Sequence, residues 1–432
     1  MSSDRPIDES TFKEITARAS LGRDYYWKRD YLLAAHAFVQ LFEVNPKAWW
    51  FALEALRSLR RTPGIQDLSS SNAQILFSPN YAGNSYQNNL YSEQKEFGYE
   101  AIPVERLSLD EQLAAFTLTD QSVFHQHWLK ELYWRATDLT TGITEIDRHI
   151  GILKAIRCFG IPVVWTLHNL IDHDASELQT ELCIYAIQKI AEVSDAILLH
   201  TERAGSQLSE ICGKDLSKKY KLLPHPLYDD LLEKVTPQIP IEINVQSLAN
   251  RRLLVAAGMI RPYKGIPELI DAFSKLTNKN ADHNLHLVIA GHCSDQLVRQ
   301  KLDKLPTAIR DMISFVPRKL TDAELVGLMN LASVCVTPYR KVLTSGSFYL
   351  TTTFRKPTIA PRIGMFAEIM RNNETGFIYD GSVYALASTL AYVSQLSDKE
   401  LSDVGSAVYN ENSEWTVSAA STRLFEILEH LN

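Results

Sequence analysis

The sequence predicts an α/β protein made of two Rossmann-like domains, preceded by a helical extension. Three observations lead to this prediction. From Gln74 onward, short apolar runs alternate with amphipathic stretches, a pattern typical of a parallel sheet wrapped by helices. A polar stretch with two prolines, residues 235–250, interrupts the alternation, which then begins again. Residues 10–62 lack such runs and have a helical pattern throughout.

These observations divide the 432 residues into four segments. We expect a helical extension (1–65), a first Rossmann-like domain (66–234), a second one (251–410) and a C-terminal helix (411–432). The expected strands of the first domain are QILFS, AIPV, SVFHQH, PVVWTLH and AILLH. Those of the second are RLLVAAG, LHLVIAG, ISFV, SVCVTPY, PTIAP and GFIYD. Ligands of such sheets bind beyond the carboxyl ends of the strands, so the motifs of interest follow these runs.

The helical extension has the residue spacing of a tetratricopeptide helix pair. Its marker residues are Gly22, Tyr25, Ala34, Phe38 and Pro46. Small residues let two helices approach, aromatic residues fill the seam, and a proline ends the second helix. A third helix is expected over residues 47–61. Because one such repeat cannot bury its own apolar face, we expect it to pack on the next domain.

Composition excludes several classes of protein. The formal net charge is -7, with 44 basic and 51 acidic residues, which argues against a nucleic-acid-binding protein. The five cysteines form no C-x-x-C pair, so we expect buried thiols in a reducing compartment. The polar start resembles no signal peptide, and no run of 18 apolar residues occurs. We therefore expect a cytoplasmic protein that meets any lipid-linked substrate at the inner face of the membrane.

The first motif is Gly258-Met-Ile-Arg-Pro-Tyr-Lys-Gly265, which follows a buried strand and opens a helix. Gly258 permits a tight turn. Arg261 and Lys264 then lie near a helix N-terminus, where backbone N–H groups already favour an anion. A diphosphate suits this place. A solvated basic turn is the alternative interpretation.

The second motif is Thr344-Ser-Gly-Ser347, which follows the run SVCVTPY and begins a helix. The hydroxyls and free amides of Ser345, Gly346 and Ser347 can form a nest for phosphate oxygens. It lacks the glycine–lysine pattern of a P-loop. A simple helix cap is the alternative. The two motifs support each other because they follow strands of the same domain.

Histidines follow two strands of the first domain: His125 and His127, then His168 with Asn169, and later His173. An H-x-H pair on a strand places both side chains on one face. No Cys or nearby Glu completes a zinc set, so we expect no metal. A polar site for sugar hydroxyls is the favoured interpretation, and a core histidine is the alternative for His125.

Three carboxylates follow the run PVVWTLH: Asp172, Asp174 and Glu177. One of them is a candidate general base. Acids that precede a helix are commonly caps, which is the competing interpretation for each.

Much of residues 74–385 resembles the GT-B glycosyltransferases, in particular the bacterial relatives of glycosyltransferase family 4 that build exopolysaccharides. The stretches that match are FHQHWL, VVWTLHNLIDHD, LLPHPLY, AAGMIRPYKGIPELIDAF, LVIAGHC, TDAELVGLMNLASVCVTPYRKVLTSGS, RKPTIAPRIGMFAEIM and ETGFIYD. The helical extension is not part of that family pattern.

The resemblance implies a site. It implies that Arg261 and Lys264 hold the donor diphosphate, that Ser345, Gly346 and Ser347 donate to it, and that Glu368 lies nearby. It also implies that His127 lies near the donor sugar and the acceptor. Retaining members usually carry a pair of glutamates, and the corresponding positions are Val342 and Leu350 here. This departure leaves the stereochemistry and the donor base open.

We therefore expect a metal-independent hexosyltransferase that needs no cofactor. A nucleoside-diphosphate sugar would bind the second Rossmann-like domain, and a glycan or lipid-linked acceptor would bind the first, in polysaccharide biosynthesis. His127, Asp172 and Asp174 are the catalytic candidates, and His168 and Asn169 would bind the acceptor. The helix over residues 47–61, with two tryptophans and several basic residues, is a candidate membrane contact. A non-catalytic nucleotide-sugar-binding scaffold and a sugar-nucleotide epimerase are the competing functions.

Overall fold

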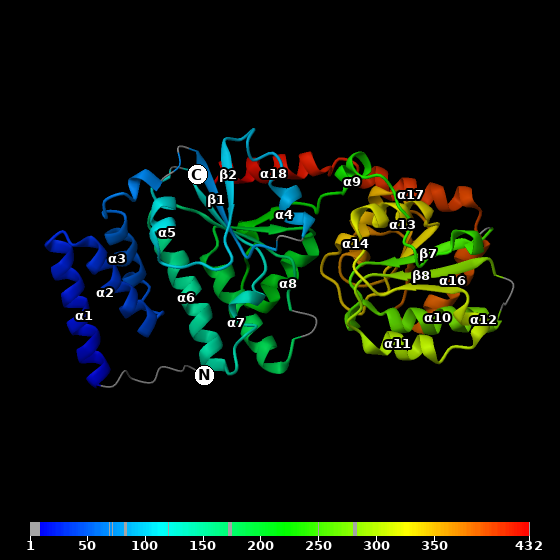
Figure 1. The fold of residues 1–432 in the computed structure, drawn as a ribbon, viewed down its shortest axis with the longest axis horizontal. Coiled ribbons are helices and arrows are strands. Elements are labelled where there is room, and N and C mark those ends of the chain that lie inside the picture. The colour runs from blue at the N-terminus through cyan, green and yellow to red at the C-terminus, as the bar shows by residue number, and fades with distance from the viewer. Residues whose placement is uncertain are drawn as a thin grey trace. The chain divides into compact units, whose positions relative to one another are not determined.

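The computed structural model describes residues 9–431 except for residues 69, 71, 82–83, 120, 172–174, 249 and 280–282. Contacts divide the chain into two compact units. The first contains Met1–Leu199, Gly205–Leu223 and Ser421–Asn432, and the second contains His200–Ala204 and Pro224–Ala420. Each unit holds one parallel sheet (Figure 1).

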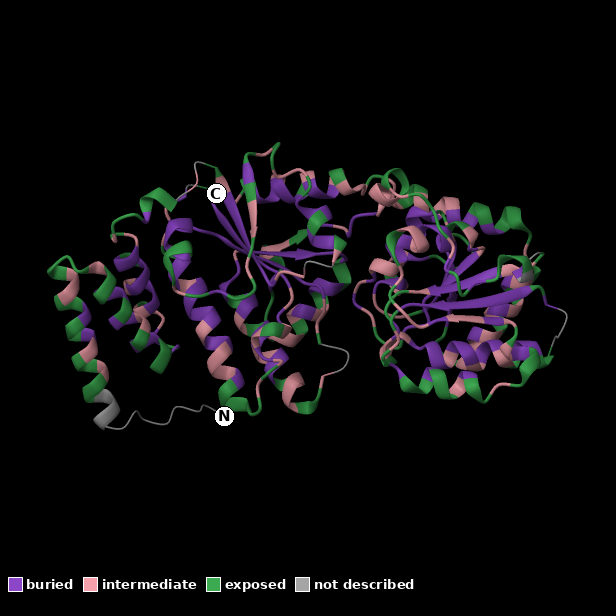
Figure 2. Cartoon of the chain, viewed as in Figure 1, coloured by how far each residue is buried: buried purple, intermediate pink, exposed green. Residues whose placement is uncertain are grey.

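The first unit is built around a six-stranded sheet with the order β2-β1-β3-β4-β5-β6. Its strands are β1 (Ala73–Ser78), β2 (Tyr99–Pro103), β3 (Val123–Gln126), β4 (Val163–Thr166), β5 (Ala196–Leu199) and β6 (Tyr220–Leu222). β3, β4 and β5 are buried along their whole length, because helices cover both faces of the sheet (Figure 2). The sequence did not predict β6, a short edge strand with two exposed residues.

Helices α4 (Ser85–Leu90), α5 (Glu111–Phe116), α6 (Leu139–Arg157) and α7 (Glu177–Val193) follow the strands of this unit, together with α8 (Glu202–Cys212), whose first three residues belong to the second unit. Helix α7 begins behind a capping box made by Ser176 and Gln179. Helix α6 begins at Leu139. The carboxylate of Asp138 accepts a hydrogen bond from the Thr141 amide at 2.9 Å and caps this start.

The helical extension consists of α1 (Glu9–Trp27), α2 (Tyr31–Val44) and α3 (Trp50–Leu59). Phe38 is buried at its centre, and a Cβ atom on Gly22 would lie only 3.0 Å from the Phe38 ring. On the other side, a Cβ atom on Gly151 of α6 would lie 2.6 Å from the Phe42 ring. The extension thus packs closely on α6, as its apolar face led us to expect. Its similarity to a tetratricopeptide repeat stays a prediction.

The second unit has a six-stranded parallel sheet with the order β12-β11-β10-β7-β8-β9. Its strands are β7 (Arg252–Ala257), β8 (Leu285–Ala290), β9 (Ile313–Val316), β10 (Val334–Val336), β11 (Thr358–Pro361) and β12 (Phe377–Tyr379). All of them fall within the predicted runs. The helices are α9 (Asp229–Lys234), α10 (Ile266–Lys279), α11 (Gln296–Asp303), α12 (Thr307–Arg310), α13 (Asp322–Leu331), α14 (Gly346–Thr353), α15 (Phe366–Ile369), α16 (Val383–Gln395) and α17 (Asp398–Asn412).

The last helix, α18 (Val417–Glu429), returns to the first unit from residue 421 onward. The Ser421 hydroxyl donates to the Leu90 carbonyl at 2.8 Å and accepts from the Glu93 amide at 3.0 Å. The Phe425 ring stacks on Phe97 at 5.1 Å. The end of the chain thus packs on the first unit.

The cysteines form no disulfide. Cys183 and Cys335 are buried as expected, whereas Cys158 is exposed and Cys212 and Cys293 are half-buried. The expectation of buried thiols is therefore wrong for three of them. These three lie at helix ends or in a loop. The number of cysteines in a sequence does not indicate how far each one is buried.

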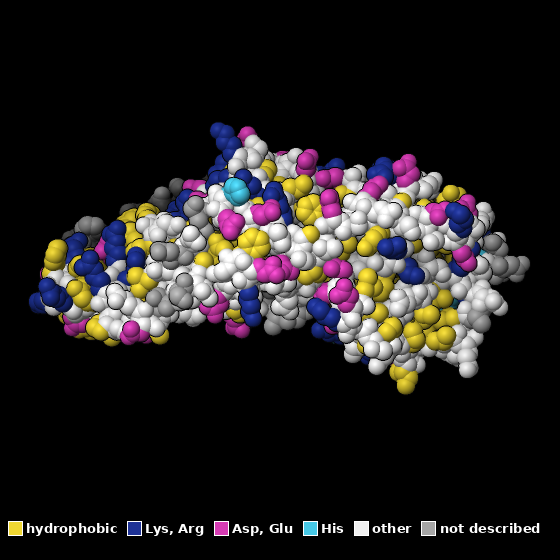
Figure 3. Space-filling view, turned by 90° about the horizontal axis from the view of Figure 1, so that it is seen from above, with side chains coloured by type: hydrophobic (Ala, Val, Ile, Leu, Met, Phe, Trp, Pro, Cys, Tyr) yellow, Lys and Arg dark blue, Asp and Glu magenta, His cyan; other side chains and the backbone are white. Residues whose placement is uncertain are grey.

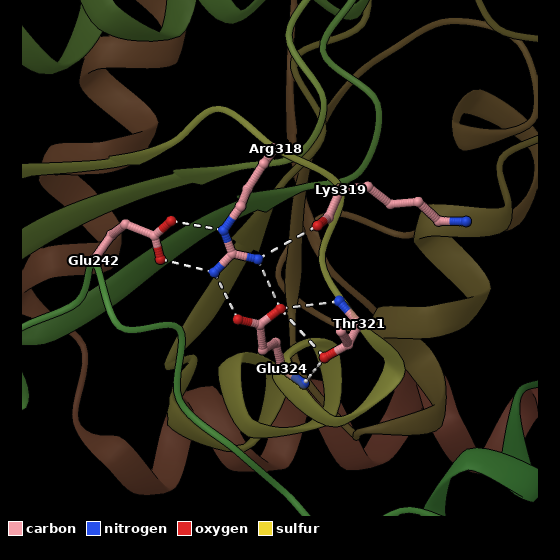
Figure 4. A network of polar contacts seen from close by, with 5 residues as sticks. All are labelled: Glu242, Arg318, Lys319, Thr321 and Glu324. Carbon is pink, nitrogen blue, oxygen red and sulfur yellow. Dashed lines mark hydrogen bonds and ion pairs between the residues drawn. The ribbon is translucent and has the colours of Figure 1, made fainter.

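Arg318 joins Glu242, in the segment before β7, to Glu324 at the start of α13. The Arg318 guanidinium donates to Glu242 at 2.7 and 2.8 Å and to Glu324 at 2.6 and 2.8 Å (Figure 4). Glu324 also accepts from the Thr321 amide at 3.0 Å, within the capping box of α13. These bonds, first those from Arg318 and then that from Thr321, lower the pKa of Glu324 to about 2.

We expect this network to make stability depend on pH in the acidic range. The pKa of Glu324 is lower in the folded chain than its ordinary value of 4.5, so its contribution is fully present above pH 4.5. It is lost as pH falls from there through about 2. Urea midpoints of Arg318→Ala should therefore lie below wild type at neutral pH and converge with it in acid.

Lys319→Ala is the matched control, because the Lys319 ammonium points away from both carboxylates in Figure 4. It should follow the wild-type curve. A constant gap between wild type and Arg318→Ala at every pH would contradict the electrostatic origin.

Candidate functional site

Two predicted motifs meet at the carboxyl end of the second sheet. The sheet order reverses between β7 and β10, and ligands of open α/β sheets bind at such a switch point. Gly258 follows β7, and Ser347 lies in the first turn of α14, beyond β10. A Cβ atom on Gly258 would lie 3.3 Å from the Ser347 hydroxyl oxygen. The two motifs are thus in contact across the switch point.

Glycines allow the backbone to approach closely here. Gly258 has a φ of +117°. Gly291 follows β8, and a Cβ atom on it would lie 1.8 Å from the carbonyl oxygen of Gly258. A Cβ atom on Gly265 would lie 1.8 Å from the Pro338 carbonyl oxygen. Neither of the last two positions accepts a side chain without a shift of backbone. The turn that carries Lys264 is therefore held against the end of β10.

Lys264 is positioned by a tyrosine that the sequence did not single out. Its ammonium donates to the Tyr339 hydroxyl at 2.5 Å and lies 3.8 Å from the centre of that ring. Burial alone would raise the pKa of Tyr339. The Lys264 charge, together with hydrogen bonds from Lys264, Ser347 and Ser345, lowers the pKa below its ordinary value instead. Lys264, Tyr339, Ser345 and Ser347 form one polar cluster.

The serine motif begins helix α14. The Ser345 side chain caps the helix by accepting from the Phe348 amide at 3.3 Å. Gly346 faces Tyr228, since a Cβ atom on it would lie 2.7 Å from the Tyr228 hydroxyl. A helix N-terminus with its positive dipole end thus lies beside the Lys264 ammonium. Arg261 comes from the same turn as Lys264, and its Nε lies 2.8 Å from the Met259 sulfur.

This arrangement can bind and stabilise a polyanion. It combines a half-buried ammonium, serine and tyrosine hydroxyls, and a helix N-terminus at a sheet switch point. Each group favours negative charge, and a diphosphate would satisfy several of them together. We call Gly258, Lys264, Tyr339, Ser345, Gly346 and Ser347 the diphosphate cradle.

Glu368 has another set of contacts. Its carboxylate accepts from the amides of Glu202 at 3.0 Å and Arg203 at 3.2 Å, at the start of α8. It thus serves as a helix cap. The two positions at which retaining members usually carry glutamates have apolar side chains here. Leu350 is buried in the core, and Val342 is half-buried.

In the first unit, the histidines form a buried network. The Tyr91 hydroxyl lies 2.7 Å from His125 Nδ1 and 2.8 Å from His127 Nε2. His125 Nε2 lies 2.7 Å from the Thr166 hydroxyl, and His127 Nδ1 lies 3.1 Å from His168 Nε2. Both imidazoles of the H-x-H pair therefore point to the same side, as predicted. Both are 0% exposed.

Burial lowers the pKa of His125 to about 3, so this ring is neutral at physiological pH. Both ring nitrogens of His127 have protein partners, and this residue also borders a small cavity, so its place near a sugar stays a prediction. His168 and Asn169 border a cavity of about 20 Å³, which has room for little more than a water molecule. Asp172, Asp174 and His173 lie outside the described residues. Glu177 is the first residue of α7.

Comparisons with known proteins agree with this architecture. Residues 250–395 match the family "Glycosyl transferases group 1". The chain is 24% identical over 312 residues to a GDP-mannose:glycolipid 4-beta-D-mannosyltransferase of Xanthomonas campestris pv. campestris, covering 71% of this chain and 79% of that protein. It is also 24% identical over 326 residues to a D-inositol 3-phosphate glycosyltransferase of Corynebacterium glutamicum, covering 67% and 71%.

Solved structures share the fold. An alpha,alpha-trehalose-phosphate synthase (UDP-forming) from Burkholderia vietnamiensis superposes with a TM-score of 0.63 at 10% identity, covering 84% of this chain and 99% of that chain. Anabaena HepE in complex with UDP-glucose gives a TM-score of 0.61 at 13% identity, covering 83% and 99%. The family match, the relatives and the two parallel α/β units together identify this chain as a glycosyltransferase of the GT-B fold.

Proposed function

We propose that this glycosyltransferase takes a hexose from a nucleoside-diphosphate sugar and transfers it to a glycan or lipid-linked acceptor. The observation that supports the donor most directly is the diphosphate cradle, in which Lys264, Tyr339 and two serines surround a helix N-terminus. The relatives' names point the same way: one uses GDP-mannose and a glycolipid, and one fold neighbour holds UDP-glucose. A role in polysaccharide biosynthesis is part of this proposal.

The main chemical need of such a transfer is stabilisation of the leaving group. Negative charge develops on the diphosphate as the bond to the sugar breaks. In the proposed reaction, the Lys264 ammonium and the amides at the start of α14 stabilise that charge, and Arg261 contributes from the same turn. These groups take the place of a divalent cation, so we propose that the reaction needs no metal and no cofactor.

We expect turnover to survive EDTA, because fixed protein groups stabilise the leaving diphosphate. A panel of UDP- and GDP-sugars, incubated with and without an acceptor in EDTA, tests the proposed function directly by nucleoside diphosphate release. Release with one donor supports it. Activity that returns only with Mg²⁺ or Mn²⁺ would contradict the metal-free step, and nucleotide binding without release would favour a scaffold.

The helical extension offers a second candidate membrane contact besides the expected helix. Trp50, at the start of α3, is 53% exposed, and Arg60 and Arg61, which follow α3, lie over the rings of Phe159 and Tyr26. Trp27, at the end of α1, is 81% exposed beside Lys28 and Arg29. Basic and hydrophobic side chains are interspersed over this region (Figure 3). No helix of the described chain is long and apolar enough to cross a bilayer.

We propose that Trp27 and its basic neighbours hold the enzyme at an anionic membrane surface. Wild type should therefore float with vesicles that contain phosphatidylglycerol and not with neutral ones, and Trp27→Ser should float less. Tyr384→Ser is the matched control, since Tyr384 is an exposed aromatic residue (73%) of the second unit. Equal flotation of wild type and Trp27→Ser would refute this contact.

A further inference from the structure

A larger cavity lies elsewhere in the first unit. It has a volume of about 410 Å³, which is within the usual range for small-molecule sites. Ser78 ends β1, Gln126 ends β3 and Arg106 follows β2, so the cavity opens at the carboxyl ends of three neighbouring strands. The sheet order β2-β1-β3 reverses there, which makes it the switch point of the first sheet. Of the predicted site residues that the structure describes, none lines it.

One histidine of this cavity has a protonation state that its neighbours determine. Gln126 donates its amide N–H groups to the carbonyls of Ser78 and Trp128, both at 3.1 Å, so its Oε1 must be an acceptor. That oxygen lies 2.7 Å from His149 Nε2, which therefore carries the proton. Burial and the charge of Arg106 lower the pKa of His149 to about 3, and the ring is neutral.

The other ring nitrogen, Nδ1, is then an acceptor with a lone pair. Among the described residues it has no hydrogen-bond partner, although His149 is only 5% exposed. His149 Nδ1 can therefore accept a hydrogen bond from a hydroxyl group of a ligand in this cavity.

The rest of the lining supplies the complementary groups. Arg106 is ion-paired with Glu145, and Arg148 with Glu43 and more distantly with Glu145, whereas Arg135 has no ion pair among the described residues. Trp128 adds an aromatic surface. The charged groups of the lining are balanced in number: Arg106, Arg135 and Arg148 against Glu105, Glu131 and Glu145.

We propose that this cavity binds a pyranose ring of the acceptor, with His149 Nδ1 accepting from a ring hydroxyl and Arg135 donating to ring oxygens. A sugar presents hydroxyls that both donate and accept, together with an apolar face that can lie on Trp128. A balanced charged lining offers donors and acceptors without selecting an anion. This moves the acceptor site from the small cavity at His168 and Asn169 to the larger one, which shares Trp128 with it, and it rests on the proposed transferase function.

The test measures sugar binding to the full chain without any donor. Saturation-transfer NMR with methyl pyranosides of glucose, mannose and galactose, and with glucuronic acid, should detect at least one ligand. Its affinity should fall about fivefold or more in His149→Phe and in Arg135→Ala, because each leaves a ligand group unpaired. His149→Gln should retain more of the pyranoside affinity than His149→Phe, since the new amide can donate to Gln126 and still offer its oxygen to the sugar.

Two control variants test for indirect effects. His36→Phe and Arg23→Ala change exposed residues of the helical extension that do not line the cavity, and both should bind as wild type does. Thermal unfolding identifies any variant that fails to fold. Absence of binding by every pyranoside, or unchanged affinity in both His149→Phe and Arg135→Ala, would overturn the inference.

The same samples separate this inference from the proposed function. Titration with UDP and GDP reports on the diphosphate cradle, which belongs to the other unit. Nucleotide binding and turnover without pyranoside binding would remove the cavity assignment alone. Pyranoside binding without any nucleotide binding would remove the donor proposal and leave the cavity as a sugar site.

Discussion

Lys264→Ala is expected to weaken binding of UDP or GDP by roughly 10- to 150-fold, the effect of losing one charged hydrogen bond worth about 1.5–3 kcal/mol. The fold should stay intact. Lys264 is half-buried and contributes no core side chain, and its ammonium donates a hydrogen bond to the Tyr339 hydroxyl. Isothermal titration calorimetry of wild type and variant gives the two affinities directly. Arg261→Ala should weaken binding in the same direction.

Lys275→Ala provides a matched control. Lys275 lies on α10, the helix that follows the Lys264 turn, and its ammonium also lies over a tyrosine ring, that of Tyr384 at 4.4 Å. It is exposed and far along the helix from the cradle, so affinity should not change. Tyr339→Phe should cause a smaller loss than Lys264→Ala, because it frees the ammonium but removes a hydroxyl. Unchanged nucleotide affinity in both Lys264→Ala and Arg261→Ala would eliminate the cradle as the donor site.

The sheets could be predicted from sequence because their central strands are buried on both faces. β4 and β5 are almost entirely apolar for that reason, and similar apolar runs located all strands of the second sheet. β6 was missed because an edge strand with exposed Lys221 and Leu222 has no such run. The return of α18 to the first unit depends on contacts such as that of Phe425 with Phe97, which are distant in sequence.

The donor side could be predicted in part. Glycines and basic residues after β7, and a serine–glycine pair after β10, mark two strand ends, and the sheet order makes those ends neighbours. Tyr339 was missed because its role depends on Lys264, 75 positions earlier in the chain. The contacts of Glu368 could not be predicted either, because the amides of Glu202 and Arg203 lie about 165 positions earlier in the chain; its place in the donor site stays a prediction.

The acceptor side was less accessible to sequence analysis. An H-x-H pattern fixes which side chains share a face but not what covers that face. Here Tyr91, from the segment after α4, covers both imidazoles. His149 lies in the middle of α6, where a lone histidine in an amphipathic helix carries no signal. Only its contact with Gln126, from a strand end, gives its second nitrogen a defined role.

His127→Ala is expected to abolish most turnover, but through the core of the first unit rather than through contact with substrate. The side chain is fully buried, and its removal leaves a cavity and takes one hydrogen bond from the Tyr91 hydroxyl and one from His168 Nε2. Such a loss typically costs roughly 2–5 kcal/mol of unfolding free energy. Urea unfolding measures it, and turnover is then compared per folded molecule.

Two further variants separate packing from chemistry. His286→Ala removes another buried histidine, 5% exposed and bonded to Ser314 at 2.9 Å in the second unit, and reports what loss of a buried imidazole costs there. Tyr91→Phe keeps the packing but breaks the link between His125 and His127, so it should destabilise less than His127→Ala. Nucleotide affinity of folded His127→Ala should equal wild type, because the diphosphate cradle belongs to the other unit. If His127→Ala unfolds at the wild-type urea concentration and still loses its turnover, the residue acts on the substrate and the structural assignment is wrong.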